Sequence, residues 1–222
     1  MNSRSKTMKG KKNIVVIVAH PDDETLWCGG TMLLNPNYNW FVACLCRKYD
    51  PDRALKFKKA LIAFNAMGIM GNLDDGPEQL PLDDKTVKDA ILKLLPDKNF
   101  DLILTHSPFG EYTRHLRHEE IGRAVMDLWS EQKINAKQLW TFAFEDGNKK
   151  YYPKAIMGAN IHQTLSQNIW NEKYRIITEV YGFERNGFEA KTTPKTEAFW
   201  KFNTPRDVEK WLEQEGNQYL IK

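Results

Sequence analysis

The sequence is poor in cysteine, and it has no long hydrophobic run. It has three cysteines among 222 residues, Cys28, Cys44 and Cys46. A small and odd number argues against a disulfide framework and favours a reducing compartment. No segment approaches the roughly 20 consecutive apolar residues that a membrane-spanning helix needs. The sequence therefore predicts a soluble, cytoplasmic protein without a membrane partner.

An excess of charge of either sign is also missing. The chain has 32 basic and 29 acidic residues, which give a net charge of +3. This balance argues against nucleic acid and against an anionic membrane as a partner. The basic residues of the first 12 positions surround no apolar segment, so residues 1–12 are predicted to form a disordered basic tail rather than a signal peptide. Residues 13–222 suit a single domain, and the sequence leaves open whether it forms a homo-oligomer.

What the sequence does contain is an alternation of strand-like runs with amphipathic helices. Residues 13–19 (NIVVIVA) form a continuous, largely β-branched run, as is typical of a strand buried on both faces of a parallel sheet. The same reasoning predicts strands at residues 40–46, 101–105 and 138–144, and helices at residues 26–34, 52–67 (with Gly68 as C-cap), 83–95 and 121–129. This alternation indicates an α/β fold with a doubly wound, mostly parallel central sheet and right-handed crossovers.

The pattern weakens beyond Gly147. A helix is predicted near residues 161–171, strands near residues 174–181 and 198–202, and a last helix at residues 205–214. No repeat or low-complexity linker separates this region from the rest. It is therefore assigned to the same domain, and its role is left open.

Polar residues that can carry chemistry gather after two of the predicted strands. His20 and Asp23 follow the first strand, and His106, His115 and His118 follow the strand that ends near position 105. In open α/β sheets, ligands bind at the carboxyl ends of the strands. An imidazole and a carboxylate three residues apart on a strand-to-helix turn can bind one ion, and a third imidazole from a separate loop leaves a position open for water. The pattern predicts a catalytic metal site.

Two residues beside this site suit hydrolysis. Asp22 lies between two of the proposed ligands, and a carboxylate there can accept a proton from water that a metal has made acidic. His115 lies three residues before His118 and can face the same water from the other side. It can stabilise a developing oxyanion and protonate a leaving nitrogen.

Other interpretations of these residues are open. Acidic residues after a first strand also occur in receiver domains, which bind magnesium, but those need a phosphoacceptor Asp at the end of a later strand, and Asp101 begins its strand. Isolated His and Asp residues near strand ends often serve as helix caps. A non-catalytic sugar-binding module is a further alternative. A metallophosphoesterase is another, although it usually needs more carboxylates and a second metal.

Two motifs combine these residues into one known pattern. Residues 19–24 (AHPDDE), followed by Gly-Gly-Thr at residues 29–31, resemble the signature of the LmbE-like, or PIG-L, family of N-acetylglucosamine deacetylases. Residues 105–112 (THSPFGEY), running on to residues 115–118, resemble the family's second motif. The resemblance covers roughly residues 13–145. It implies a Rossmann-like three-layer sandwich and zinc-dependent hydrolysis of an N-acyl group on a sugar derivative.

The resemblance also implies roles for individual residues. By motif position, the metal ligands are His20, Asp23 and His118, the general base is Asp22, and the electrophilic or acid partner is His115. Zinc suits two imidazoles and one carboxylate, as do iron(II) and other divalent ions. The second motif departs from the family's usual His-Pro-Asp-His, because residues 115–118 read HLRH.

The remaining expectations concern the surroundings of this site. Arg53 and Arg114 are candidate contacts to an N-acylated amino-sugar substrate, although exposed arginines are common. Residues 74–76 (Asp-Asp-Gly) are expected to form a turn, with lining of the sugar pocket as the alternative. Glu24 is expected to support the first turn of its helix rather than to bind metal. His106 is expected to pack at its strand end, with a contact to a metal ligand as the alternative. The whole pattern predicts a metal-dependent hydrolase that removes an N-acyl group, such as acetyl, from an amino sugar or a related small amide.

Overall fold

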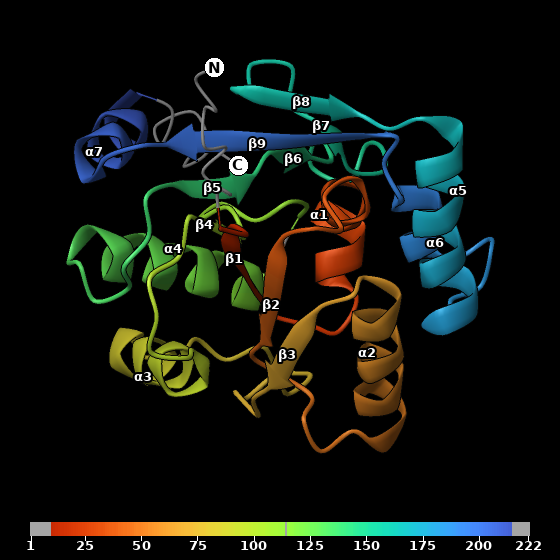
Figure 1. Cartoon of the computed structure of the whole chain (residues 1–222), viewed down its shortest axis with the longest axis horizontal. Helices are drawn as coiled ribbons and strands as arrows, with labels where there is room; N and C mark the ends of the chain where they lie inside the picture. Colours follow the sequence, from red (N-terminus) through yellow and green to blue (C-terminus); the bar gives the residue numbers. More distant parts are fainter. Residues whose placement is uncertain (1–9, 114, 215–222) are drawn as a thin grey trace, which may run out of the picture.

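A mostly parallel sheet of seven strands forms the centre of the molecule in a computed structural model that describes residues 10–113 and 115–214 (Figure 1). The five parallel strands are, in spatial order, β3 (Met67–Met70), β2 (Asn39–Cys44), β1 (Asn13–Val18), β4 (Leu102–Thr105) and β5 (Leu139–Phe142). Two antiparallel strands, β9 (Thr196–Phe202) and β8 (Ile161–Thr164), complete the sheet beside β5. The predicted α/β fold with a mostly parallel sheet is confirmed.

Helices cover both faces of this sheet, which makes three layers. On one face lie α1 (Asp23–Leu34), α2 (Pro51–Ala63), α5 (Gln167–Arg175), the π-helix η1 (Ile176–Val180) and α6 (Phe188–Thr192). On the other lie α3 (Asp84–Leu94), α4 (Leu116–Ser130) and α7 (Pro205–Gln214). A short hairpin pairs β6 (Phe144–Glu145) with β7 (Lys154–Ala155).

The run of apolar residues in β1 explains why the strand is central. Val15 and Ile17 pack into the core under α3 and α4, while Val16 and Val18 pack into the core under α1 and α2. All four side chains are fully buried. Successive residues of a strand point to opposite faces, so a strand that is covered on both sides must be apolar at every position.

Three predicted elements differ from the structure. The helix predicted at residues 52–67 ends at Ala63, and Gly68 belongs to β3 instead of capping the helix. A Cβ at position 68 would lie 2.7 Å from the carbonyl oxygen of Val42, so glycine permits the close approach of β3 to β2. Close packing in the sheet, rather than a helix end, is the reason for this glycine.

The C-terminal region accounts for the other two differences. Residues predicted as a helix near 161–171 divide into β8 and α5, because Ile161–Thr164 pairs with the long strand β9. Residues predicted as a strand near 174–181 form the end of α5 and η1. Their buried members, Ile176, Ile177 and Tyr181, follow a helical spacing widened by one residue, which resembles neither a regular α-helix nor a strand. The strand predicted at 198–202 and the last helix, 205–214, are present as β9 and α7.

A buried ion pair fastens the C-terminal region to α1. Lys173 of α5 donates to Oε1 of Glu197 in β9 over 2.7 Å, and both side chains are fully buried. The same carboxylate accepts hydrogen bonds from the backbone N–H groups of Gly30 and Thr31 and from the Thr31 hydroxyl, each at 2.7 Å. Every oxygen of this buried carboxylate is therefore satisfied. The contact holds the helix that follows β1 in a fixed position.

The structure bears on the cysteines, on membrane-spanning helices and on the basic tail. All three cysteines lie in the described part of the chain, and each is a buried free thiol. Within residues 10–113 and 115–214, no helix is both long and apolar enough to cross a membrane. Positions 1–9 of the predicted basic tail lie outside the described residues.

Candidate active site

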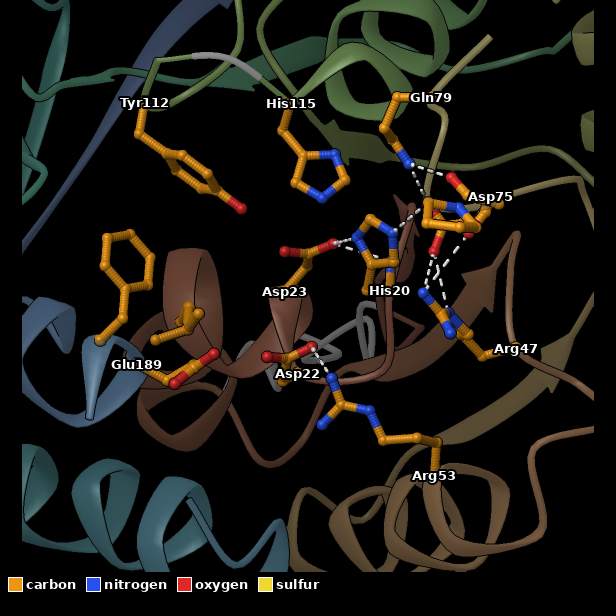
Figure 2. A pocket seen from close by; sticks show the side chains of 14 residues that line it. His20, Asp22, Asp23, Arg47, Arg53, Asp75, Gln79, Tyr112, His115 and Glu189 are labelled. Atoms are coloured by element: carbon orange, nitrogen blue, oxygen red, sulfur yellow. Dashed lines mark hydrogen bonds and ion pairs between the residues drawn. The ribbon is translucent and has the colours of Figure 1, made fainter. Parts of the chain in front are cut away.

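A pocket opens at the carboxyl ends of β1, β2 and β4, where the sequence places its polar motifs (Figure 2). Its volume is about 230 Å³. Residues from the β1–α1 turn, the loops after β2 and β3, the segment before α4, and α6 line it: His20, Asp22, Asp23, Leu26, Arg47, Arg53, Asp75, Gly76, Pro77, Gln79, Tyr112, His115, Phe188 and Glu189. This is the edge of the sheet at which α/β folds bind ligands.

Three donor atoms meet at the inner end of this pocket. Nδ1 of His20, Oδ2 of Asp23 and Nε2 of His118 lie 3.3 Å from one another along all three sides of a triangle. Donors in a tetrahedral zinc site, with bonds of about 2.0–2.1 Å, are roughly 3.4 Å apart. Two imidazole nitrogens and one carboxylate oxygen at this spacing fit a divalent metal of the zinc type.

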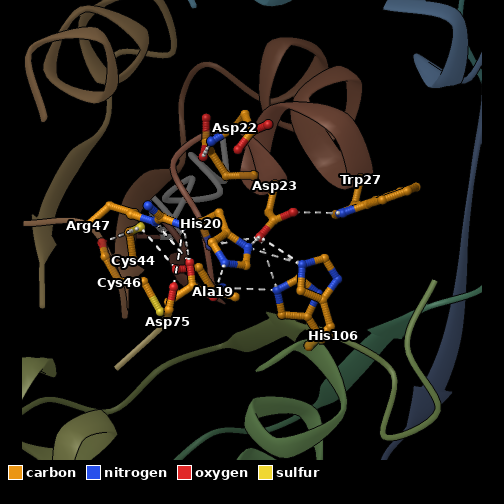
Figure 3. Close-up of polar contacts among 12 residues, drawn as sticks. Ala19, His20, Asp22, Asp23, Trp27, Cys44, Cys46, Arg47, Asp75 and His106 are labelled. Carbon is orange, nitrogen blue, oxygen red and sulfur yellow. Dashed lines mark hydrogen bonds and ion pairs between the residues drawn. The ribbon is translucent and has the colours of Figure 1, made fainter. Parts of the chain in front are cut away.

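Each of these three side chains makes a second polar contact, and Figure 3 shows those of Asp23 with Trp27 and of His20 with Asp75. The other oxygen of Asp23 accepts a hydrogen bond from the indole of Trp27 over 3.2 Å. Nδ1 of His118 lies 2.7 Å from Oε2 of Glu111, and Nε2 of His20 lies 3.2 Å from Oδ1 of Asp75. Carboxylates that contact the far nitrogen fix the tautomer and orientation of histidines that bind metals.

Close packing of α4 brings His118 to the site. A Cβ on Gly122, one turn after His118, would lie 2.6 Å from the carbonyl oxygen of His106. Only glycine lets the helix approach the end of β4 this closely. His118 is fully buried as a result.

His106 does more than pack at the end of its strand. The fully buried ring accepts the backbone N–H of Ala19 at Nε2 over 3.0 Å, and its Nδ1 lies 3.0 Å from Glu111. Its Nε2 is also 3.4 Å from Oδ2 of Asp23. His106 and Glu111 thus form a buried polar layer beneath the three donors.

Asp22 has an unusual backbone and an unsatisfied carboxylate. Its φ angle is 131°, in a region that a residue with a Cβ occupies at a cost of about 1–3 kcal/mol. The side chain is buried, and its Oδ1 has no hydrogen-bond partner among the described residues; the nearest cation is Nη2 of Arg53, at 3.7 Å. Burial and the neighbouring Asp23 raise the pKa of Asp22 well above its ordinary value. A carboxylate in this state readily accepts a proton.

His115 lies opposite Asp22, at the start of α4, and its side chain does not cap the helix. Its ring stacks on His118 with centroids 4.4 Å apart and is 4.5 Å from the ring of His20. Burial and these two imidazoles lower the pKa of His115 to about 3. The neutral imidazole is therefore the resting form at neutral pH.

The structure brings most of the predicted site residues together. His20, Asp22, Asp23, Arg53 and His115 line the pocket, and His118 lies beneath it. Arg114 lies outside the described residues.

Several residues around the pocket are not among the predicted site residues. Asp75, read from the sequence as part of a turn, contacts His20 and pairs with Arg47. Phe188 and Glu189 of α6 also line the pocket, and Figure 2 shows Glu189 on the side away from Asp75 and Arg47. Glu111 lies seven residues before His118 in the second motif, so the sequence could have identified it as a site residue. The two α6 residues stand in a region without a recognisable motif.

Comparison with known families agrees with this geometry. The model of a family described as "PIG-L: GlcNAc-PI de-N-acetylase" matches residues 15–129, just over half of the 222 residues. The chain belongs to the PIG-L family. The matched segment contains most of β1, both motifs and all three donors of the triangle.

Solved structures and one viral protein are similar to this chain. N,N'-diacetylchitobiose deacetylase from Pyrococcus horikoshii has a TM-score of 0.66 at 15% identity, over 86% of this chain and 84% of that chain. The zinc-inhibited form of teicoplanin deacetylase Orf2 has a TM-score of 0.61 at 13% identity, over 85% and 97% of the two chains. An uncharacterized protein, L374, of Acanthamoeba polyphaga mimivirus is 24% identical over 183 residues, 75% of this chain and 77% of that protein.

A further neighbour shows that the fold alone leaves the reaction undetermined. GalB, the 4-carboxy-2-hydroxymuconate hydratase of Pseudomonas putida KT2440, has a TM-score of 0.59 at 14% identity, over 86% of this chain and 95% of that chain. The PIG-L family and the deacetylase neighbours support a deacetylase. The finer assignment rests on the site residues.

Proposed function

We propose that this protein is a metal-dependent N-deacetylase that removes the acetyl group from an N-acetylated amino sugar or a related small amide. The observation that carries the proposal is the triangle of His20, Asp23 and His118, each side 3.3 Å, beside the unsatisfied carboxylate of Asp22. These groups supply a metal site and a general base within one pocket, as metal-assisted hydrolysis requires.

The metal would be held by Nδ1 of His20, Oδ2 of Asp23 and Nε2 of His118. Two nitrogens and one oxygen suit zinc, and iron(II) is an alternative that the same set accepts. Bound there, the metal would supply Lewis-acid chemistry, which makes water acidic enough to attack an amide near neutral pH. The contacts of Glu111 and Asp75 keep the two imidazoles oriented for this purpose.

Asp22 and His115 divide the remaining work. Oδ1 of Asp22, buried and without a hydrogen bond, takes the proton of the attacking water. His115, whose lowered pKa keeps it neutral, donates a ring N–H to the oxygen on which negative charge develops. Of the two roles that the sequence allows this histidine, the electrophilic one fits its surroundings better. The proton on Asp22 is then available to the leaving nitrogen.

The polar pocket suits a substrate with several hydroxyl groups. Arg53 from α2 and Glu189 from α6 line it, with a donor on one side and an acceptor on the other. Phe188 and Tyr112 form an aromatic wall, their ring centroids 5.2 Å apart. A sugar ring presents both an apolar face and polar edges, so an N-acetylated amino sugar fits this lining. Arg114 remains a candidate contact to the same substrate.

The direct test is release of acetate from a panel of N-acetylated amino sugars. N-acetylglucosamine and its glycosides are expected to release acetate when zinc or iron(II) is supplied, and chelation is expected to abolish the release. Re-addition of the metal should restore it. Metal-independent release, or release only of phosphate from sugar phosphates, would reject the proposal.

A substitution of Arg53 tests the substrate side of the proposal. Arg53→Ala is expected to raise KM by about tenfold, since a hydrogen bond to a charged group contributes about 1.5–3 kcal/mol. The metal content should be unchanged, because Arg53 pairs with Asp22, which is not one of the three proposed metal donors. Arg123→Ala, on the exposed side of α4, is the matched control and should leave KM at the wild-type value. An unchanged KM in Arg53→Ala would remove this residue from the binding site.

A further inference from the structure

The strained backbone of Asp22 is held in place from both sides. Its carbonyl oxygen accepts hydrogen bonds from the N–H groups of Thr25 and Leu26, at 2.9 and 2.8 Å, which begin α1. Its own N–H donates to Oε2 of Glu24 over 3.1 Å. The peptide cannot rotate to a relaxed φ without breaking these contacts, so they determine where the Asp22 carboxylate points.

Glu24 can hold Asp22 only because its own charge is satisfied inside the protein. The side chain is fully buried. Oε1 accepts hydrogen bonds from the hydroxyl of Thr25, at 2.6 Å, and from the hydroxyl of Tyr181, at 2.7 Å. Tyr181 is the one donor to this carboxylate in the described chain that comes from outside the β1–α1 turn. Loss of such a donor leaves part of a buried charge unsatisfied, which costs free energy, and we expect the carboxylate to shift its remaining contacts.

A π-helical turn places the Tyr181 hydroxyl against Glu24. The N–H of Tyr181 bonds to the carbonyl oxygen of Ile176, five residues earlier, instead of four as in an α-helix. One residue of register rotates a side chain by about 100° around a helix axis. An α-helical continuation of α5 would therefore turn Tyr181 away from Glu24. Single π turns occur frequently at functional sites.

We propose that Tyr181 is a positioning residue for Asp22, acting through Glu24, and that this is a function of the C-terminal region. The inference rests on the proposed role of Asp22 as general base. Tyr181 is 1% exposed, does not line the pocket and does not contact His20, Asp23 or His118. The hydrogen bond that its hydroxyl makes in the described chain is to Glu24, so we expect its effect on the reaction to pass through Glu24 and the backbone of Asp22.

Tyr181→Phe tests this role, because it removes one hydroxyl and keeps the ring. Loss of a group that orients a catalytic side chain typically costs about 10–100-fold in activity, so kcat should fall by that factor. KM and metal content should equal those of the wild type. Tyr174→Phe is the matched control, since this tyrosine lies in α5, before η1, and its hydroxyl has no hydrogen-bond partner among the described residues. That variant should retain the wild-type kcat.

The same variant shows whether Tyr181 positions Asp22 or only stabilises the fold. In a double-mutant cycle with Glu24→Gln, the two losses in kcat should not add, because both act on one path to Asp22. Fully additive losses, a kcat equal to that of Tyr174→Phe, or loss of metal in Tyr181→Phe would each overturn the proposal.

A crystal structure of Tyr181→Phe separates this inference from the proposed function. We expect the Asp22 carboxylate to turn away from the position it has beside Arg53 and opposite His115. If the wild type releases no acetate, the proposed function fails, and the structure alone decides the positioning role. An Asp22 backbone and carboxylate that stay unchanged in the variant would reject that role.

Discussion

His118→Ala is expected to lose the bound metal and to lose activity by at least about 10²-fold, since metal catalysis contributes several kcal/mol to the rate. His118 provides one corner of a triangle of three donors, and Nε2 is its only atom that faces the other two. With two donors left, the site cannot compete with water for a divalent ion. Elemental analysis of protein purified without chelator measures the loss directly.

His162→Ala is the control for this experiment. His162 is an exposed histidine on β8, and its ring contacts the backbone carbonyl of Ile156, far from the triangle in the sequence. The control should retain the metal content and the activity of the wild type. Equal metal content in His118→Ala and the wild type would show that the ligand assignment is wrong, whatever the activity.

Asp22→Asn is expected to keep its metal and to lose activity by on the order of 10²-fold or more, as removal of a general base does. The amide has nearly the size of the carboxylate but cannot take up a proton. The three donor atoms are contributed by other residues, so the site should bind metal as before. Metal analysis and initial rates on the same preparation separate the two effects.

Asp52→Asn is a matched control for this variant. Asp52 lies at the start of α2 with its side chain 66% exposed, and its partner is Lys56, outside the pocket. Its substitution should change neither metal nor rate. If Asp22→Asn instead lost its metal while Asp52→Asn retained it, Asp22 would be a ligand and not a base.

Local sequence was sufficient to predict the first half of the site. The run of apolar residues in β1, followed by His20 and Asp23 three positions apart, places an imidazole and a carboxylate on one tight turn. That geometry depends on neighbours in the chain, so a motif can encode it. The apolar patterns of β1, β2, β4, α3 and α7 likewise indicate which faces of these elements are buried, and each pattern lies within a single element.

Residues 161–181 could not be predicted in this way. The side chains of β8 are mostly exposed, because it is an edge strand, and η1 spaces its buried residues by a π turn. Neither produces the period of two or of 3.6 that identifies a strand or a helix. An edge strand and a π turn depend on the elements that pack against them. Here β8 pairs with β9, and η1 packs against α1, α2 and α6.

The sequence by itself determined the family, the fold class and the motif residues proposed for the metal and the base. Only the tertiary structure decided what surrounds them. Asp75 contacts His20, Tyr181 contacts Glu24, and Glu189 lines the pocket beside the motif at 19–24. These residues lie between 55 and 165 positions from their partners or from the end of that motif. Such contacts arise when separate helices and loops pack over one edge of the sheet, and the local periodicity of the sequence cannot predict them.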